Sequence, residues 1–348
     1  MRVGLVSPYD LGRPGGVQDQ VIRLAGWLSE AGHDPVIVGP GTEGPEEAIL
    51  LGATRVITAN RAATPILLDP RVGRALARAL AGVDVIHVHE PLMPAVSPAA
   101  LRVDGPPKVA TFHADPPGWV RRLYRYGRSG VRMALHGASV VTVTSPVSGS
   151  SIDGIVDYRI IPNGIDVGRY VAGPKDPLRV AFLGRDDERK GLSVLLDAWP
   201  TVRKSIPGAM LSVMGADRGE RSDGVEYRGW VGDDVKRDML GAATVFCAPN
   251  LGGESFGITL AEAMAASCAV VASALPAFEY VAGSAARFVE PGDPASLAEE
   301  IIDLLANPAT AHDLGNAAAE RVQQFDGSTV SAAFVSAYAD ALAAQATL

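Results

Sequence analysis

One stretch decides the fold of this chain: Val245-Phe-Cys-Ala-Pro-Asn-Leu-Gly-Gly-Glu-Ser-Phe-Gly-Ile-Thr-Leu-Ala-Glu-Ala-Met264. Its first four residues form an apolar run of strand length, and a glycine-rich turn then leads into residues with helical spacing. Because the run is apolar throughout, it predicts a strand buried on both faces, as in a parallel sheet covered by helices. The turn leaves the first N–H groups of the helix free, so it favours a bound anion.

Two carboxylates mark this stretch. Glu254 comes just before the helix and Glu262 lies eight residues later, a rise of ~12 Å. That is longer than the about 5–9.5 Å between the two carboxyls of a glycosidase. The spacing suits a grip on opposite ends of one long polar ligand, although a capping Glu followed by a surface Glu fits the same residues.

The strand-and-helix pattern extends outward over the whole chain. In the second half we expect strands at 179–183, 210–214, 225–227, 245–248, 269–272 and 287–289, with the clearest helices at 192–204, 259–266 and 296–306. In the first half we expect strands at 3–7, 36–38, 83–88, 109–112 and 140–144, and a helix at 17–31. A Pro- and Gly-containing linker at 171–177 separates the halves. The pattern predicts two α/β domains, 1–167 and 168–327, with a final helix, 328–348, that packs back on the first.

Basic residues follow one strand of the second half. Arg185 comes directly after the strand that ends in Phe182-Leu-Gly184, and Lys190 precedes the next helix. Two cations at the carboxyl end of a strand can hold a diphosphate and stabilise it as a leaving group. Since Asp186, Asp187 and Glu188 lie between them, a solvated loop is the alternative.

The first half offers weaker signals. Gly15-Gly-Val-Gln18 opens a helix after the first strand but lacks the G-x-G-x-x-G spacing of dinucleotide-binding proteins. His113 follows a strand, and of His87 and His89 we expect only one to face a site. No D-x-D follows a strand and no His–carboxylate pair has metal-ligand spacing, so we expect no metal.

Arginines cluster between Pro116 and Ile152, a segment that contains no acidic residue. A helix over 119–133 would align Arg121, Arg125, Arg128 and Arg132 on one face, beside aromatic side chains. A second helix after Pro70 would align Arg71, Arg74 and Arg78. Such stripes fit an anionic membrane surface, and equally two solvated helix faces.

Composition and charge exclude several classes. The chain has 348 residues, 47% hydrophobic and 20% charged, so it is not disordered and can build two cores. The net charge of −8 argues against nucleic-acid binding, but it is uneven: residues 1–170 hold 17 Lys and Arg against 15 Asp and Glu. Cys247 and Cys268 lie in apolar runs and are expected to be buried thiols. No signal peptide or apolar span is evident, so we expect a cytoplasmic protein.

Together these motifs resemble glycosyltransferase family 4 (GT4), retaining enzymes with a GT-B fold of two Rossmann-like domains. The residues that carry the resemblance are 15–18, His113, the run Ile161-Pro-Asn-Gly-Ile-Asp166, Arg185 with Lys190, and 247–262. Within the family, Ser7-Pro-Tyr9, His87-Val-His-Glu-Pro91 and Val109-Ala-Thr-Phe-His113 most resemble the actinobacterial phosphatidylinositol mannosyltransferases. The chain departs from that pattern at 114–118 and is shorter at 145–160.

The resemblance implies a role for each matching residue. Arg185 and Lys190 would hold the donor diphosphate, Glu254 and the backbone of Ser255, Phe256, Gly257 and Ile258 the hexose, and Glu262 the ribose. Val231 and Lys236 would lie near the base. Gly16 would let the first loop approach the diphosphate, Tyr9 and Gln18 would line the acceptor pocket, and His113 would sit near the reacting centre.

The function that follows is transfer of mannose from GDP-mannose to phosphatidyl-myo-inositol by a monomer on the inner face of the plasma membrane, without cofactor or metal. The alternatives are another nucleotide sugar with a soluble acceptor such as inositol phosphate, a GT-B nucleotide-sugar epimerase, a nucleotide-dependent oxidoreductase, which the missing G-x-G-x-x-G disfavours, and a lipid-binding module. The last would not explain Arg185, Lys190, Glu254 and Glu262 together.

Overall fold

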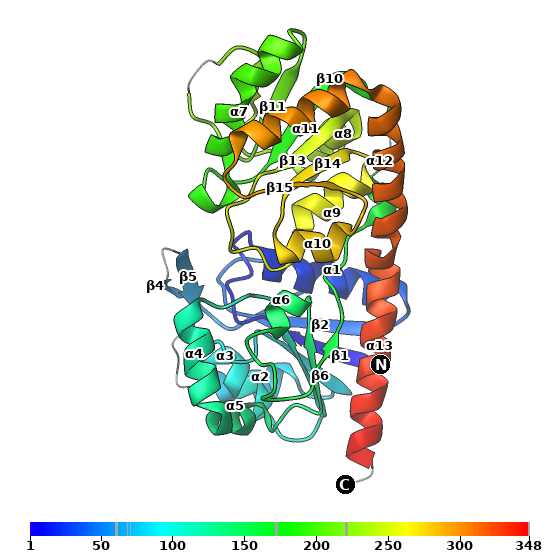
Figure 1. The fold of residues 1–348 in the computed structure, drawn as a ribbon. Coiled ribbons are helices and arrows are strands. Elements are labelled where there is room, and N and C mark those ends of the chain that lie inside the picture. The colour runs from blue at the N-terminus through cyan, green and yellow to red at the C-terminus, as the bar shows by residue number, and fades with distance from the viewer. Residues whose placement is uncertain (60–61, 68, 70, 171–172, 220–221, 347–348) are drawn as a thin grey trace. The chain divides into compact units, whose positions relative to one another are not determined.

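We describe a computed structural model of the chain that places residues 1–59, 62–67, 69, 71–170, 173–219 and 222–346. The chain divides into two compact units, which are described separately. Unit 1 comprises Met1–Gly164 and Gly327–Leu348, and unit 2 comprises Ile165–Asp326. Figure 1 colours the chain from end to end, and the C-terminal helix α13 (Gly327–Ala346) belongs to unit 1 although it follows unit 2 in sequence.

Unit 1 is built on a parallel sheet of seven strands in the order β3-β2-β1-β6-β7-β8-β9. The strands are β1 (Arg2–Val6), β2 (Asp34–Gly39), β3 (Ile49–Leu50), β6 (Val85–His89), β7 (Lys108–Phe112), β8 (Val140–Val143) and β9 (Arg159–Ile160). A separate antiparallel pair, β4 (Arg55–Ala59) and β5 (Ala62–Ile66), follows β3. The other helices are α1 (Gly16–Glu30), α2 (Val72–Ala79), α3 (Val96–Leu101), α4 (Gly118–Tyr126), α5 (Arg128–Leu135) and α6 (Pro146–Gly149).

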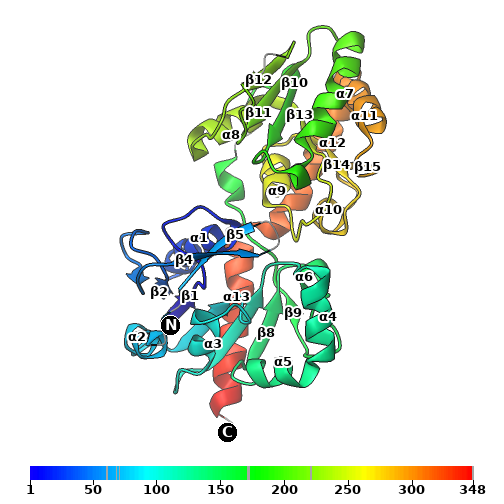
Figure 2. The same cartoon turned by 90° about the vertical axis from the view of Figure 1, so that its left-hand side faces the viewer.

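Unit 2 has a parallel sheet of six strands in the order β12-β11-β10-β13-β14-β15, seen in Figure 2. The strands are β10 (Asp176–Leu183), β11 (Met210–Met214), β12 (Val225–Tyr227), β13 (Ala243–Ala248), β14 (Ala269–Ser273) and β15 (Arg287–Val289). The helices are α7 (Leu192–Ser205), α8 (Asp233–Ala242), α9 (Ile258–Ala265), α10 (Pro276–Ala282), α11 (Pro294–Ala306) and α12 (Pro308–Arg321). Short 3-10 turns are η1 (Val167–Arg169), η2 (Glu188–Lys190) and η3 (Val322–Phe325). Two parallel-sheet α/β units confirm the predicted fold class.

The strand order places one switch point in each sheet. In unit 2 the chain runs outward from β10 in one direction to β11 and β12, and in the other to β13, β14 and β15. In unit 1 the corresponding switch lies between β1 and β6. Because ligands of open parallel sheets bind at the carboxyl ends of strands beside such a switch, the loops after β10 and β13 and those after β1 and β6 are where sites are expected.

Packing of α13 on unit 1 explains why the tail returns to the first sheet. Phe334 and Tyr338 are buried in a core cluster with Val21 and Trp27 of α1. Gly327 starts the helix against that indole, where an added Cβ would lie 2.1 Å from a Trp27 ring atom. Only glycine fits so close an approach.

The helix considered over 119–133 is interrupted at one residue in the structure. The structure has two helices, α4 and α5, that break at Gly127. Gly127 and Gly130 lower helix propensity in the middle of the segment. The arginines therefore do not form one continuous stripe. Among the described residues, none of the helices combines the length and apolar character needed to cross a bilayer.

Candidate functional site

The loops after β10 and β13 meet in unit 2 around one ion pair. Lys190 Nζ donates to Glu254 Oε2 at 2.8 Å, and Asn250 Nδ2 donates to the same oxygen at 3.0 Å. The loops also touch through their backbones, since Leu251 N donates to Arg189 O at 2.8 Å. Gly191 makes this approach possible: its φ is +68° and an added Cβ would lie 1.8 Å from Pro249 O. The structure thus brings together Lys190 and Glu254, which lie 64 residues apart.

Arginines surround this pair. Arg185 is exposed at the end of β10, and its side chain forms no hydrogen bond or ion pair within the described part of the chain. Arg189 contacts Asp187, with Nη2 and Oδ2 2.8 Å apart, and this hydrogen bond lowers the pKa of Asp187 to about 2. Lys190 and Arg189 therefore both interact with Glu254, whereas Arg185 of the same loop is exposed and interacts electrostatically with Asp187.

The turn into α9 supplies backbone donors. Gly257 is the N-cap with φ +99°, and no side chain caps the helix there. Ser255 and Ile258 are half-buried, whereas the ring of Phe256 is buried against Phe325, with ring centroids 5.3 Å apart. Phe256 can therefore contribute only its backbone to a ligand. Free N–H groups at a helix start attract anionic or polar groups.

A second ion pair joins helix α9 to helix α8. Glu262 of α9 is buried and its Oε1 accepts from Lys236 Nζ at 2.9 Å. The same ammonium lies 3.0 Å from Asp233 Oδ1. Val231, just before α8, packs partly buried against the core of this unit. The structure thus brings together two of the predicted donor residues, Lys236 and Glu262.

In unit 1 the predicted acceptor residues lie at the ends of β1 and β7. Tyr9 follows β1 and is half-buried, and burial together with the nearby Glu90 raises its pKa well above the usual value. Gln18 is buried in the first turn of α1, where its Nε2 donates to Asp10 O at 3.3 Å. Gly16 is the first residue of α1, whose N-cap, Gly15, makes no side-chain capping bond.

Both ring nitrogens and the backbone N–H of His113 have hydrogen-bond partners. Its Nε2 lies 2.8 Å from His89 Nδ1 and its Nδ1 lies 3.2 Å from Asn163 Oδ1. Its backbone N–H donates to Glu90 Oε1 at 2.7 Å. Burial lowers the pKa of His113 to about 4, so the ring is uncharged at neutral pH. An uncharged imidazole supplies no positive charge to a diphosphate, and both ring nitrogens of His113 already have partners within the chain.

Two family models together match most of the chain. Residues 14–169 match the family described as Glycosyltransferase Family 4, and residues 177–307 match the family described as Glycosyl transferases group 1. The chain belongs to glycosyltransferase family 4. Members of this family transfer a sugar from a nucleotide donor to an acceptor, so the chain is a glycosyltransferase.

Curated relatives cover nearly the full length of this glycosyltransferase. The phosphatidyl-myo-inositol mannosyltransferase of Mycolicibacterium smegmatis is 33% identical over 97% of this chain and 93% of its own. That of Mycobacterium leprae is 34% identical, over 97% and 96%. That of Propionibacterium freudenreichii is 33% identical, over 88% and 87%.

Solved structures show the same GT-B architecture. Anabaena HepE in complex with UDP has a TM-score of 0.75 with 19% identity, covering 97% of this chain and 100% of its own. Sucrose-phosphate synthase from Thermosynechococcus elongatus has a TM-score of 0.72 with 23% identity, covering 99% of each chain. At these identities the likeness concerns the fold alone.

Sequence reasoning missed part of this glycosyltransferase's histidine cluster. The expectation that only one of His87 and His89 faces a site is wrong, because alternate residues of a strand point to the same face. Their rings stack with centroids 4.1 Å apart. His87 bonds to Tyr338 of α13, whereas His89 bonds to His113. Glu90 and Asn163 were not predicted as site residues. Each lies inside a motif that carries the family resemblance, His87–Pro91 and Ile161–Asp166.

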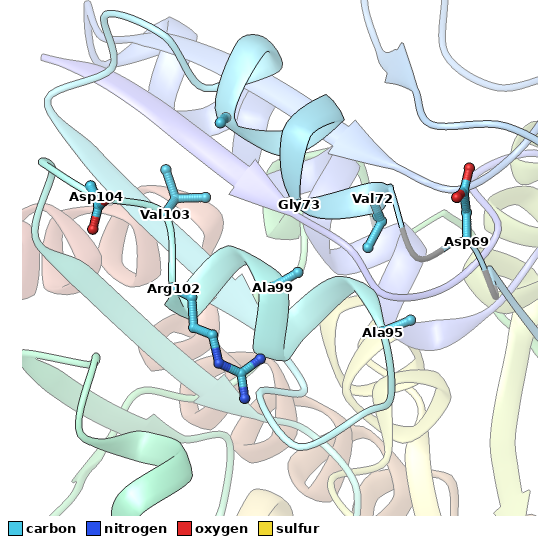
Figure 3. A pocket seen from close by; sticks show the side chains of 9 residues that line it. Asp69, Val72, Gly73, Ala95, Ala99, Arg102, Val103 and Asp104 are labelled. Atoms are coloured by element: carbon cyan, nitrogen blue, oxygen red, sulfur yellow. The ribbon is translucent and has the colours of Figure 1, made fainter.

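A separate pocket of unit 1, of about 590 Å³, lies between α2 and α3. Figure 3 shows it bordered by Val72 and Gly73 on one side and by Ala95, Ala99 and Arg102 on the other. None of the predicted site residues lines it. It therefore adds no group to the donor or acceptor residues described above.

Proposed function

We propose that this glycosyltransferase transfers mannose from GDP-mannose to phosphatidyl-myo-inositol with retention at the anomeric carbon. The single observation that carries the donor half is the Lys190–Glu254 pair at the β10/β13 switch, beside Arg185 and the start of α9. The choice of mannose and of the lipid acceptor follows the names of the relatives that share a third of the sequence over nearly the whole chain.

Each half of the donor meets a matching group in unit 2. Arg185 and Lys190 hold the diphosphate, and Glu254 turns from the lysine to the hexose hydroxyls. The backbone of residues 255–258 supports the same sugar. Glu262 takes the ribose, with Val231 and Lys236 near the base.

No side chain is assigned as a covalent nucleophile. The acceptor hydroxyl attacks from the face that the diphosphate leaves, at a centre with oxocarbenium character, and the departing diphosphate takes the hydroxyl proton. The protein contributes orientation and positive charge around the leaving group. Tyr9, Gln18 and His113 orient the acceptor, and Gly16 leaves room for the diphosphate. We propose that no metal or other cofactor takes part.

The acceptor is lipid-borne in this proposal, so unit 1 meets an anionic membrane on the inner face. The structure favours α4 as the contacting element. Its side chains Trp119, Leu123 and Tyr126 are 58%, 59% and 87% exposed, and α4 has no buried residue. Apolar side chains interleaved with arginine on one exposed helix are typical of interfacial binding.

Labelled GDP-mannose, incubated with and without phosphatidylinositol vesicles, tests the proposal. We expect a mannosyl-lipid product only when the vesicles are present. Parallel reactions contain inositol phosphate as acceptor, and UDP-glucose or UDP-N-acetylglucosamine as donor. Product only with inositol phosphate would establish a soluble acceptor, and turnover of a UDP-sugar without any acceptor would establish an epimerase; either would overturn the proposal.

A further inference from the structure

Glu90 lies at the β1/β6 switch point of unit 1, and none of the roles proposed above uses it. It follows β6 directly, is 8% exposed and has a φ of +47°. A left-handed backbone is uncommon for a residue with a long side chain and costs about 1 kcal/mol or more, so it persists only where the surroundings impose it. Here Glu90 N donates to Thr111 O at 2.8 Å and Met93 N donates to Glu90 O at 2.9 Å.

The carboxylate holds the turn that carries His113. Its Oε1 accepts from the backbone N–H of His113 at 2.7 Å and of Ala114 at 2.6 Å. Distances this short are typical of hydrogen bonds to an ionised carboxylate. Within the described part of the chain, Oε2 makes no hydrogen bond and no Lys or Arg pairs with Glu90. Two backbone amides are therefore its principal partners.

The groups that face Glu90 are mostly uncharged at neutral pH. Tyr9 from the loop after β1 and Tyr124 from α4 interact with it electrostatically, and both phenols have raised pKa values. On the β7 side lies His113, next to His89, and burial lowers the pKa of both rings. Burial raises the pKa of Glu90 itself to about 7, although the two N–H groups oppose this shift. Its charge thus changes in the neutral range.

We propose that ionised Glu90 is the positioning residue of the acceptor side: its Oε1 holds the His113–Ala114 turn, and with it His113, in the shape that receives the acceptor. The inference rests on the proposed function, because it takes His113 to lie at the acceptor. A protonated carboxyl is a weaker acceptor for the two N–H groups. Transfer therefore increases as Glu90 ionises, whereas donor binding in unit 2 does not.

Three variants test this role. Glu90→Gln keeps an oxygen for the two N–H groups but cannot ionise, so it behaves at every pH like the protonated enzyme. We expect its kcat for transfer to lipid to be 3–10-fold below wild type at pH 8, a factor of the size set by roughly 1 kcal/mol, and to lack the wild-type increase between pH 6 and 8. Glu90→Ala loses more, and GDP affinity stays unchanged in both.

Asp293→Asn is the matched control, because Asp293 Oδ1 also accepts two backbone N–H groups, of Ala295 and Ser296, at the exposed start of α11. It should keep the wild-type profile. An unaltered pH profile in Glu90→Gln, or full transfer by Glu90→Ala, overturns the proposal.

A second measurement separates this inference from the function on which it rests. The dipeptides Phe112-His113 and His113-Ala114 each occur once in the chain. Carbonyl-¹³C labelling of Phe or His combined with ¹⁵N labelling of His or Ala therefore selects the His113 and Ala114 amides singly. We expect both amide proton shifts to titrate near pH 7 in wild type and to stay flat in Glu90→Gln. If the shifts titrate in an enzyme that makes no mannosyl-lipid, the proposed function fails and the turn-holding role stands. If transfer occurs and the shifts do not titrate, this inference is wrong.

Discussion

Lys190 and Glu254 bind each other in the structure, and the proposed donor site uses both. A diphosphate bound as proposed attracts the ammonium and repels the carboxylate, so we expect the pair to separate when the donor binds. The carboxylate is then released toward the sugar hydroxyls. One ion pair can in this way link occupation of the diphosphate site to the orientation of the hexose.

Glu254→Gln should therefore have opposite effects on GDP and on the sugar donor. We expect GDP to bind several-fold more tightly, because a negative charge beside the diphosphate is gone and Lys190 is freed. Turnover of GDP-mannose should fall by 10²-fold or more, since a charge-assisted contact to the sugar is lost. Calorimetric titration with GDP and steady-state kinetics measure the two effects.

Asp293→Asn again serves as the control, because it removes one negative charge from unit 2 at an exposed helix start. It should alter neither GDP affinity nor turnover.

Arg185→Ala and Lys190→Ala should each weaken GDP binding by about 1.5–3 kcal/mol, or ~10–150-fold. Wild-type turnover in the double variant would contradict the donor assignment.

Glu90 should also make the free energy of unfolding depend on pH. Its pKa is about 7 in the folded chain against 4.5 for the free group. Between these values the folded state holds the proton and the unfolded state does not, so the free energy of unfolding falls as pH rises from 4.5 to 7. The loss amounts to about 3 kcal/mol, given ~1.36 kcal/mol per pKa unit. Urea denaturation at pH 5 and pH 8 should show a smaller decrease for Glu90→Gln than for wild type. Equal decreases would show that the carboxyl is not buried as described.

At the scale of elements, α4 and α2 differ in what their apolar side chains do. In α2, Val72 and Leu76 are buried, so Arg71, Arg74 and Arg78 stand on an outer face without apolar neighbours of their own helix. In α4 the side chains of Trp119, Leu123 and Tyr126 are exposed, and so are those of Arg122 and Arg125. Arg121, Arg128 and Arg132 are partly engaged: Arg121 Nη1 lies 3.5 Å from Asp115 Oδ1, and the other two donate to the carbonyls of Gly154 and Ile155.

Replacing Trp119 and Leu123 of α4 with Ser should therefore abolish most binding to anionic vesicles. Arg122→Gln with Arg125→Gln should weaken it by roughly 2 kcal/mol, at about 1 kcal/mol per charge, and more at low salt. The matched set in α2, Arg71, Arg74 and Arg78 to Gln, should have the smaller effect. Vesicle sedimentation at two salt concentrations measures both. If only the α2 set matters, α4 is not the membrane contact.

What the sequence could predict follows from how local each signal is. Glu254, the glycine turn and α9 are consecutive, so strand, turn and helix could all be recognised from one run of residues. The pairing of Lys190 with Glu254 and of His113 with Glu90 depends on strand order, which places β10 beside β13 and β6 beside β7. Strand order cannot be derived from the spacing of residues along the sequence. The break at Gly127 was missed for a different reason: the arginine periodicity continues through it while the backbone does not.

For the molecule as a whole, the two units carry different charge. Residues 1–170 hold a small excess of Lys and Arg, while the whole chain has a net charge of −8. The acidic excess therefore lies in the remainder, which includes most of unit 2. In the proposed function a negatively charged donor binds there against the overall field, so the local cations of the β10 loop have to provide the attraction.

The cations of the β10 loop bear on whether the reaction needs a metal ion. Arg185, Arg189 and Lys190 stand around the β10 end, and the free N–H groups at the start of α9 add a partial positive charge. In the proposed function the protein itself neutralises the charge that develops on the leaving diphosphate, so we expect that no divalent cation is needed for that purpose. After treatment with EDTA and gel filtration, the enzyme should keep at least half of its turnover of GDP-mannose, and Mg²⁺ or Mn²⁺ should add little. Lys190→Ala provides the matched test, because activity lost with a protein cation should not return when Mg²⁺ is added. Complete loss in EDTA with recovery only on adding Mn²⁺ would mean that a metal, and not the β10 loop, neutralises the leaving group.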